Sequence, residues 1–65
     1  MPDSDVIRVL LVDDQPLFRT AIASLLSGQP DMEVVGQADN GVVGVEKAHE
    51  LKPDLVVMDL SLIHI

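Results

Sequence analysis

Three short apolar runs divide this chain, and two of them stop abruptly at aspartate. Residues 7–12 (IRVLLV) end at an Asp-Asp pair, and residues 55–58 (LVVM) end at a single Asp. Runs this short and this rich in β-branched side chains suit strands that are buried on both faces, as in a parallel sheet. The remaining run, residues 32–38 (MEVVGQA), is more polar. It therefore suits a strand at the edge of the sheet.

Two segments with a helical pattern separate the apolar runs. The first begins at Pro16, which fits the first turn of a helix, and it ends near Gly28, a common stop signal. Its apolar stripe is expected to form part of the core and comprises Phe18, Ala21, Ile22, Leu25 and Leu26. The second helix is expected between Asn40, a favoured N-cap residue, and Pro53. Its inward stripe is expected to be Val45, Ala48 and Leu51.

The alternation of strands and helices predicts an α/β fold with a parallel sheet and right-handed crossovers. We expect part of a flavodoxin-like doubly wound sheet, in which the first strand lies between the second and the third. Ligands of such sheets bind beyond the carboxyl ends of the strands, where the winding reverses. Because that point lies between the first and third strands, Asp13, Asp14 and Asp59 are expected to converge there.

Convergence of three carboxylates has a chemical consequence. Two such charges about 5 Å apart repel by roughly 3 kcal/mol at an effective dielectric constant of about 20. A cation relieves this repulsion, and oxygen ligands select Mg²⁺, Mn²⁺ or Ca²⁺. A metal there would neutralise an incoming phosphoryl group and let one carboxylate act as its acceptor. The alternative is that these acids are solvated turn residues and that Asp14 caps the first helix.

Composition excludes several other classes of function. Four basic against eleven acidic residues give a net charge of −7, which argues against contact with nucleic acid or an anionic membrane. There is no cysteine for a disulfide or a thiolate metal site. No apolar run approaches the roughly 20 residues of a membrane span, and the start is unlike a secretory signal. We therefore expect a cytoplasmic protein.

The segments RVLLVDDQPLFRTAIASLL and MEVVGQADNGVVGVEKAHELKPDLVVMDL resemble the first half of a response-regulator receiver domain of bacterial two-component systems. They are most similar to the subgroup that precedes a helix-turn-helix DNA-binding domain. The resemblance runs from about residue 7 to residue 60 and includes the motifs VDD-x-P-L-F-R and KPDLVVMDL.

The resemblance implies a signalling switch. Asp59 would accept a phosphoryl group from the phosphohistidine of a sensor histidine kinase. Asp14 would bind Mg²⁺ directly, Asp13 directly or through water, and Asp59 and the backbone carbonyl of Ser61 would complete the ligand set. Such a domain is not an enzyme beyond weak phosphorylation and dephosphorylation of itself. In an intact protein it would control DNA binding by another domain.

The resemblance also sets the expected domain boundaries. Residues 1–6 are expected to be a disordered tail, and residues 7–60 a truncated receiver domain. The family continues after its acceptor with a loop containing Pro and Gly, whereas this chain reads SLIHI, so we hypothesise that residues 61–65 are a non-native tail. No residue here matches the later Ser or Thr and Lys of the family. In this chain the third strand is expected to be a bare apolar edge, and the chain to fold poorly alone.

Three other functions are weighed against this one. A Mg²⁺-dependent phosphohydrolase of the haloacid dehalogenase type also uses an Asp after a strand, but it needs a second acid where Ser61 stands. A non-functional receiver fragment and a stand-alone interaction module are the others. The four cations, which are scattered along the chain, are expected to be solvated surface residues; they are Arg8, Arg19, Lys47 and Lys52.

Overall fold

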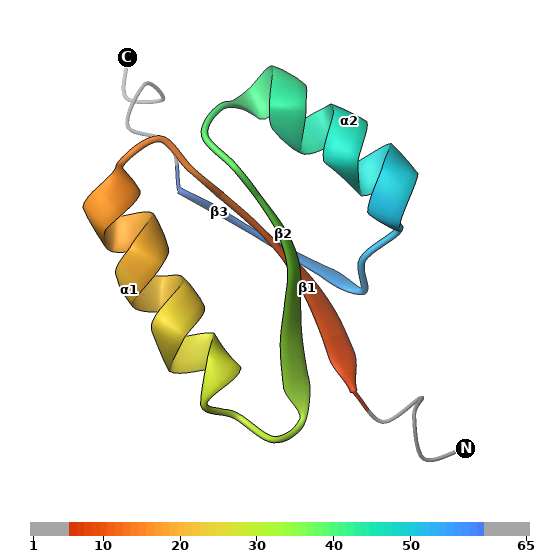
Figure 1. Ribbon diagram of the computed structural model, residues 1–65. Helices are drawn as coiled ribbons and strands as arrows, with labels where there is room; N and C mark the ends of the chain where they lie inside the picture. The colour runs from red at the N-terminus through yellow and green to blue at the C-terminus, as the bar shows by residue number, and fades with distance from the viewer. Residues whose placement is uncertain (1–5, 60–65) are drawn as a thin grey trace.

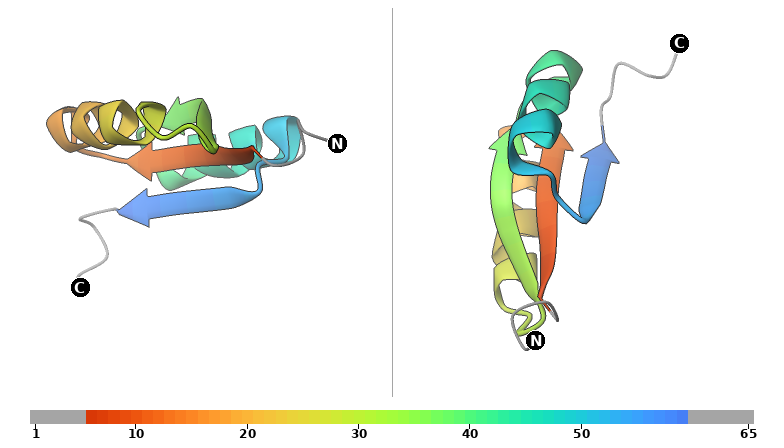
Figure 2. Two further views of the ribbon diagram at one scale, coloured as in Figure 1. Left: turned by 90° about the horizontal axis from the view of Figure 1, so that it is seen from below. Right: turned by 90° about the vertical axis from the view of Figure 1, so that its right-hand side faces the viewer.

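The computed structural model describes residues 6–59, and the expectations for residues 1–5, Ser61 and the tail at 61–65 lie outside this part. Three parallel strands form one sheet in the order β2-β1-β3, and one helix covers each face (Figures 1 and 2). The predicted partial flavodoxin-like fold is confirmed. The elements are β1 (Ile7–Asp13), α1 (Pro16–Ser27), β2 (Met32–Ala38), α2 (Gly41–Leu51) and β3 (Leu55–Asp59).

The central strand β1 carries the core. Its residues from Val9 to Val12 are almost completely buried, as the continuous apolar run predicts. Leu10 and Val12 join Ala38 of β2 in one cluster, and α2 packs against this cluster with Val43, Ala48 and Leu51. Full burial of each large aliphatic side chain contributes about 1.5 to 3 kcal/mol. Strand β1 therefore contacts both helices and pairs with both neighbouring strands.

Helix α1 begins and ends where the sequence predicts, but it turns a different face to the sheet. Phe18 is 57% exposed and Leu25 is 70% exposed, so their prediction as core residues is wrong in this chain. The half-buried stripe is displaced by about one position and comprises Arg19, Ile22, Ala23 and Leu26. The reason is that α1 packs mainly against β1 and β2, which leaves the flank that carries Phe18 exposed.

Helix α2 agrees with two of its three predicted inward residues, because Ala48 and Leu51 pack against the core cluster. Asn40 caps it as predicted, since its side-chain oxygen accepts a hydrogen bond from Val43 N at 2.9 Å. Val45 is 56% exposed, however, and the buried position is Gly44. A Cβ atom at Gly44 would lie 3.0 Å from a methyl group of Val12, so the missing side chain lets α2 approach β1 closely. The smallest residue of the helix therefore sets its inward face.

Strand β3 lies at one edge of the sheet and pairs only with β1 (Figure 2). It was predicted as a buried strand of a complete sheet and as a bare apolar edge of this chain. The structure agrees with the second prediction, because Leu55, Val56 and Met58 are all exposed. Within the described part of the chain, no helix is long and apolar enough to cross a membrane.

Candidate functional site

The register of the sheet brings two of the predicted acids to the same level. Strands β1 and β3 run parallel, and their Cα partners continue to the pair of Asp13 and Asp59, the last residue of each strand. Both backbones therefore reach the carboxyl edge of the sheet side by side. The side chain of Asp59 lies outside the described part, so the predicted roles of these residues stay predictions.

Asp13 is the one charged residue among the buried side chains of the described chain, at 2% exposed. One of its carboxylate oxygens, Oδ1, accepts a hydrogen bond from Gln15 N at 2.9 Å. The other oxygen, Oδ2, is buried and has no hydrogen-bond partner among the described residues. Burial of an unpaired carboxylate oxygen is costly, and a native chain that retains one commonly places an ion or water there. The orphaned oxygen of Asp13 therefore fits a ligand of a hard cation.

Asp14 occupies the turn between β1 and α1 and is partly exposed. The residue at the N-cap position of α1 is Gln15, and its side chain makes no capping hydrogen bond. The N-cap position therefore lies one residue later than the alternative for Asp14 assumed. Asp14 directly follows the buried Asp13 at the carboxyl edge of β1, the position from which the predicted metal ligand would act.

Three of the four cations make contacts that the sequence did not predict. The Nη1 atom of Arg19 donates to the carbonyl of Asp13 at 2.9 Å, next to the acid pair. Arg8 Nη1 donates to the carbonyls of Leu51 and Lys52 at the end of α2. The expectation that these side chains are only solvated is corrected, because each reaches a backbone carbonyl that helix or sheet geometry leaves open. No sequence signal pointed to the contact of Arg19, because the predicted inward stripe of this helix did not include it.

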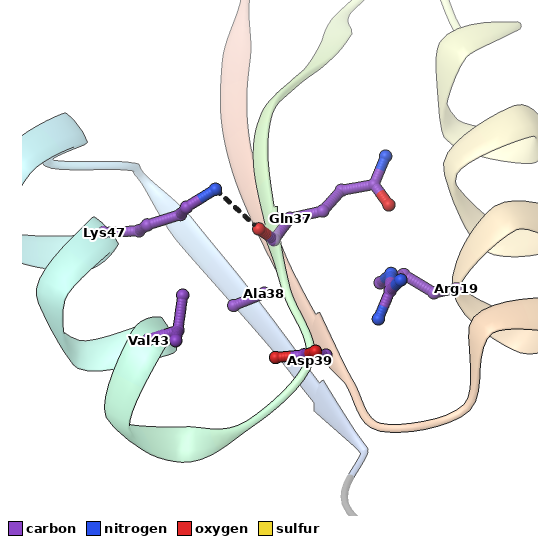
Figure 3. A pocket seen from close by; sticks show the side chains of 6 residues that line it. All are labelled: Arg19, Gln37, Ala38, Asp39, Val43 and Lys47. Atoms are coloured by element: carbon purple, nitrogen blue, oxygen red, sulfur yellow. Dashed lines mark hydrogen bonds between the residues drawn. The ribbon is translucent and has the colours of Figure 1, made fainter.

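The third of these cations lies at the edge of the sheet. Lys47 Nζ donates to the carbonyl of Gln37 in β2 at 2.9 Å (Figure 3). Lys47 from α2 and Arg19 from α1 stand on opposite sides of β2, and an open pocket of about 300 Å³ lies around the end of that strand. Its remaining lining residues are Gln37, Ala38, Asp39 and Val43. The sequence analysis did not anticipate this pocket.

A metal cluster is not complete within the described side chains. Among them, no three acidic, histidine or cysteine residues gather closely enough to hold an ion. The predicted set draws its third carboxylate from Asp59 and a carbonyl from Ser61, which lie beyond the described side chains. Asp13 and Asp14 therefore form the described half of the predicted site.

The response regulator receiver domain model matches residues 9–65, and the chain belongs to this family. It is 56% identical over 56 residues to the response regulator protein VraR of Staphylococcus saprophyticus, covering 86% of this chain and 27% of that protein. It is 44% identical over 62 residues to the nitrate/nitrite response regulator protein NarL of Escherichia coli, covering 95% of this chain and 29% of that protein.

A solved structure agrees with the fold. The crystal structure of the response regulator domain of Thermotoga maritima CheB superposes with a TM-score of 0.77 at 53% sequence identity. The match covers 78% of this chain and 38% of that one. The chain thus spans less than a third of the length of both curated relatives. Receiver domains of this family are signalling domains, which agrees with the class predicted from the sequence.

Proposed function

We propose that this chain is the phosphoryl-accepting part of a two-component phosphorelay, with Asp59 as acceptor and a sensor histidine kinase as donor. Mg²⁺ would be held by Asp13, Asp14, Asp59 and the carbonyl of Ser61. The observation that carries the proposal is the pairing of Asp13 with Asp59 at the ends of adjacent parallel strands, together with the buried Oδ2 of Asp13, which has no hydrogen-bond partner among the described residues.

In the proposed reaction a carboxylate oxygen of Asp59 attacks the phosphorus atom of a phosphohistidine. The new oxygen–phosphorus bond forms as the nitrogen–phosphorus bond breaks, and the imidazole nitrogen keeps the electron pair. Bound Mg²⁺ supplies neutralisation of the charge on the phosphoryl oxygens. Asp13 and Asp14 contribute fixed negative charge at the carboxyl edge, and Gln15 N keeps Oδ1 of Asp13 engaged so that Oδ2 is left for the metal.

The proposed output lies outside this segment. In a longer protein, the aspartyl phosphate would shift a two-state fold and so regulate a DNA-binding domain in the cytoplasm. Two observations support this division of labour. The relatives VraR and NarL carry the name response regulator and are more than three times as long as the matched segment, and the net charge of −7 makes these 65 residues a poor surface for nucleic acid.

The test is phosphorylation by acetyl phosphate with Mg²⁺, read by intact-protein mass spectrometry. We would use the 65-residue chain and a chimera, called the CheB chimera below, in which residues 9–59 replace the matching segment of the Thermotoga maritima CheB domain. We expect the addition of one phosphoryl group that requires Mg²⁺ and disappears in Asp59→Asn. Asp31→Asn is the matched control, because Asp31 is an exposed residue just before β2, at the opposite end of the sheet from Asp59, and should leave the addition unchanged.

Each rival function predicts a different result. A phosphohydrolase would release inorganic phosphate from p-nitrophenyl phosphate over many turnovers without holding a phosphoryl group. A non-functional fragment would take up no phosphoryl group in either protein. Phosphorylation that persists in Asp59→Asn would also reject the proposal, because it would place the acceptor elsewhere.

A further inference from the structure

We infer that Arg19 is a positioning residue for the metal site, acting through the backbone that joins Asp13 to Asp14; this rests on the proposed function. The guanidinium group donates from Nη1 to the carbonyl of Asp13 at 2.9 Å. It reaches back from the first turn of α1 to the last residue of β1, across six positions of the chain. Arg19 is itself partly buried, so this contact is not a freely solvated one.

At least three hydrogen bonds close the turn between β1 and α1, and Arg19 takes part in two of them. Its backbone N donates to the carbonyl of Gln15 at 2.9 Å, and its side chain donates to the carbonyl of Asp13. The third runs from Gln15 N to Oδ1 of Asp13. The backbone and the side chain of Asp13 are therefore each anchored to α1 by a separate contact.

The bond to the Asp13 carbonyl has a consequence for Asp14. The carbonyl of Asp13 and the amide N–H of Asp14 belong to one planar peptide unit. A hydrogen bond that fixes the direction of the Asp13 carbonyl therefore also fixes the orientation of the Asp14 amide group. One guanidinium thus orients the backbone of both proposed metal ligands of the turn.

A purely electrostatic role for Arg19 predicts the opposite effect on metal binding. Removal of a positive charge beside two acids should strengthen the binding of a cation. Removal of a positioning contact should weaken it, and loss of a residue that orients metal ligands typically lowers affinity by about 10- to 100-fold. The sign of the change in affinity therefore separates the two roles.

Lys47 provides a matched control for this test. It carries the same charge, lines the same pocket, and makes one side-chain hydrogen bond of 2.9 Å to a backbone carbonyl (Figure 3). Its acceptor is Gln37 in β2, however, and not the acid pair. The effect of Lys47→Met therefore reports the loss of a nearby charge without the loss of the contact to Asp13.

The experiment is a Mg²⁺ titration of the unphosphorylated protein, followed through the amide resonances of Asp13 and Asp14. We expect Arg19→Met to weaken binding by about tenfold, Lys47→Met to leave it unchanged or slightly tighter, and Arg19→Lys to lie between Arg19→Met and the parent. Equal affinities of Arg19→Met and Lys47→Met would overturn the inference. If Arg19→Met loses its dispersed amide spectrum in the 65-residue chain, the same comparison is made in the CheB chimera.

The parent protein separates failure of this inference from failure of the proposed function. If the parent binds Mg²⁺ no better than Asp14→Asn does, the proposed metal site itself is wrong. If the parent binds Mg²⁺ and Asp14→Asn does not, the site stands, and the comparison of Arg19→Met with Lys47→Met decides the role of Arg19 alone.

Discussion

Strands β2 and β3 both pair with β1 on one side only, yet the two edges that they leave are built from different residues. The β2 edge carries the exposed residues Glu33 and Gln37, and Lys47 Nζ donates a hydrogen bond to the carbonyl of Gln37. Its register with β1 also shifts once, so that Val35 has no partner. The β3 edge has no charged residue between Leu55 and Met58, and its large apolar side chains are exposed.

This difference indicates which of the two strands is suited to remain unpaired at the edge of the sheet. Natural sheets protect a free edge with charged side chains and bulges, because unpaired backbone groups otherwise attract another strand. The β2 edge has both devices. Beside β3 there is instead an apolar hollow of about 750 Å³ in which Val42 and Val45 of α2 face Met58. We conclude that β2 is a true edge strand, whereas β3 has the character of an inner strand.

The largest expected effect is a loss of stability when a side chain of the central strand β1 is truncated, compared with a truncation on the β3 edge. Leu10→Ala should destabilise the fold by about 2 to 5 kcal/mol, because Leu10 is fully buried and joins the main cluster. Leu55→Ala on the β3 edge removes a side chain that is nearly half exposed and should cost clearly less. Urea unfolding followed by circular dichroism measures both. Equal losses would show that β3 contributes to the core as much as β1 does.

The next prediction concerns how tightly α2 covers β2. A Cβ atom at Gly36 would lie 2.6 Å from Leu51 Cδ1, so Gly36→Ala should destabilise by about 1 to 3 kcal/mol through overpacking. Gly28→Ala is the control, since its nearest neighbour is 3.5 Å away and its φ of −80° suits alanine. It should be neutral or slightly stabilising. A neutral Gly36→Ala would mean that the end of the Leu51 side chain moves aside without cost.

A charge placed on each edge tests whether the chain associates with itself through β3 rather than through β2. Val56→Lys introduces a charge on the open β3 edge and should weaken self-association of the 65-residue chain by about tenfold, or about 1.4 kcal/mol. Gln37→Lys places the same charge on the protected β2 edge and should have little effect. Sedimentation velocity across a concentration series measures the association. A parent chain that is monomeric with a cooperative thermal transition would contradict the premise that β3 associates.

The smallest effect is expected from exposing the β2 edge. Lys47→Met frees the carbonyl of Gln37, and because Gln37 is exposed, water can replace the lost bond. The stability should change by no more than about 1 kcal/mol. Association should increase only modestly, because the bulge at Val35 still protects the strand. The same sedimentation series, with Lys47→Arg as control, tests this. A large increase would show that Lys47 alone keeps this edge free.

The elements were predictable because their signals are local. The apolar runs, Pro16, the Asn40 cap and Gly28 each act within a few residues, and the structure begins and ends its elements at or next to them. The inward face of α1 was predicted about one position away from where it lies, and the predicted inward face of α2 was wrong at Val45 but correct at Ala48 and Leu51. Periodicity defines a broad stripe, and the choice within it depends on a neighbouring surface that the sequence does not display, as with Gly44 beside Val12.

The candidate site was only partly predictable from the sequence: the pairing of its acids was, but the hydrogen bonds around them were not. The pairing of Asp13 with Asp59 follows from strand order, because parallel strands present their carboxyl ends at one edge. The hydrogen bonds of the cations did not follow, since they depend on side-chain reach between elements. Arg8, for example, contacts carbonyls 43 and 44 positions away. The burial of Asp13 with one unpartnered oxygen likewise required the three-dimensional packing of the turn.

The contacts of Arg8 have a consequence for the order in which the chain opens. Arg8 N donates to Oδ2 of Asp54 and Asp54 N donates to the carbonyl of Arg8, so two residues 46 positions apart hold the start of β3 against β1. The main contacts of β3 with another described element are those with β1. Breaking this pair should therefore release β3 as one cooperative unit while β1, β2 and both helices remain assembled. In hydrogen exchange, the amides of β3 should lose protection together and before those of Leu10 and Leu11.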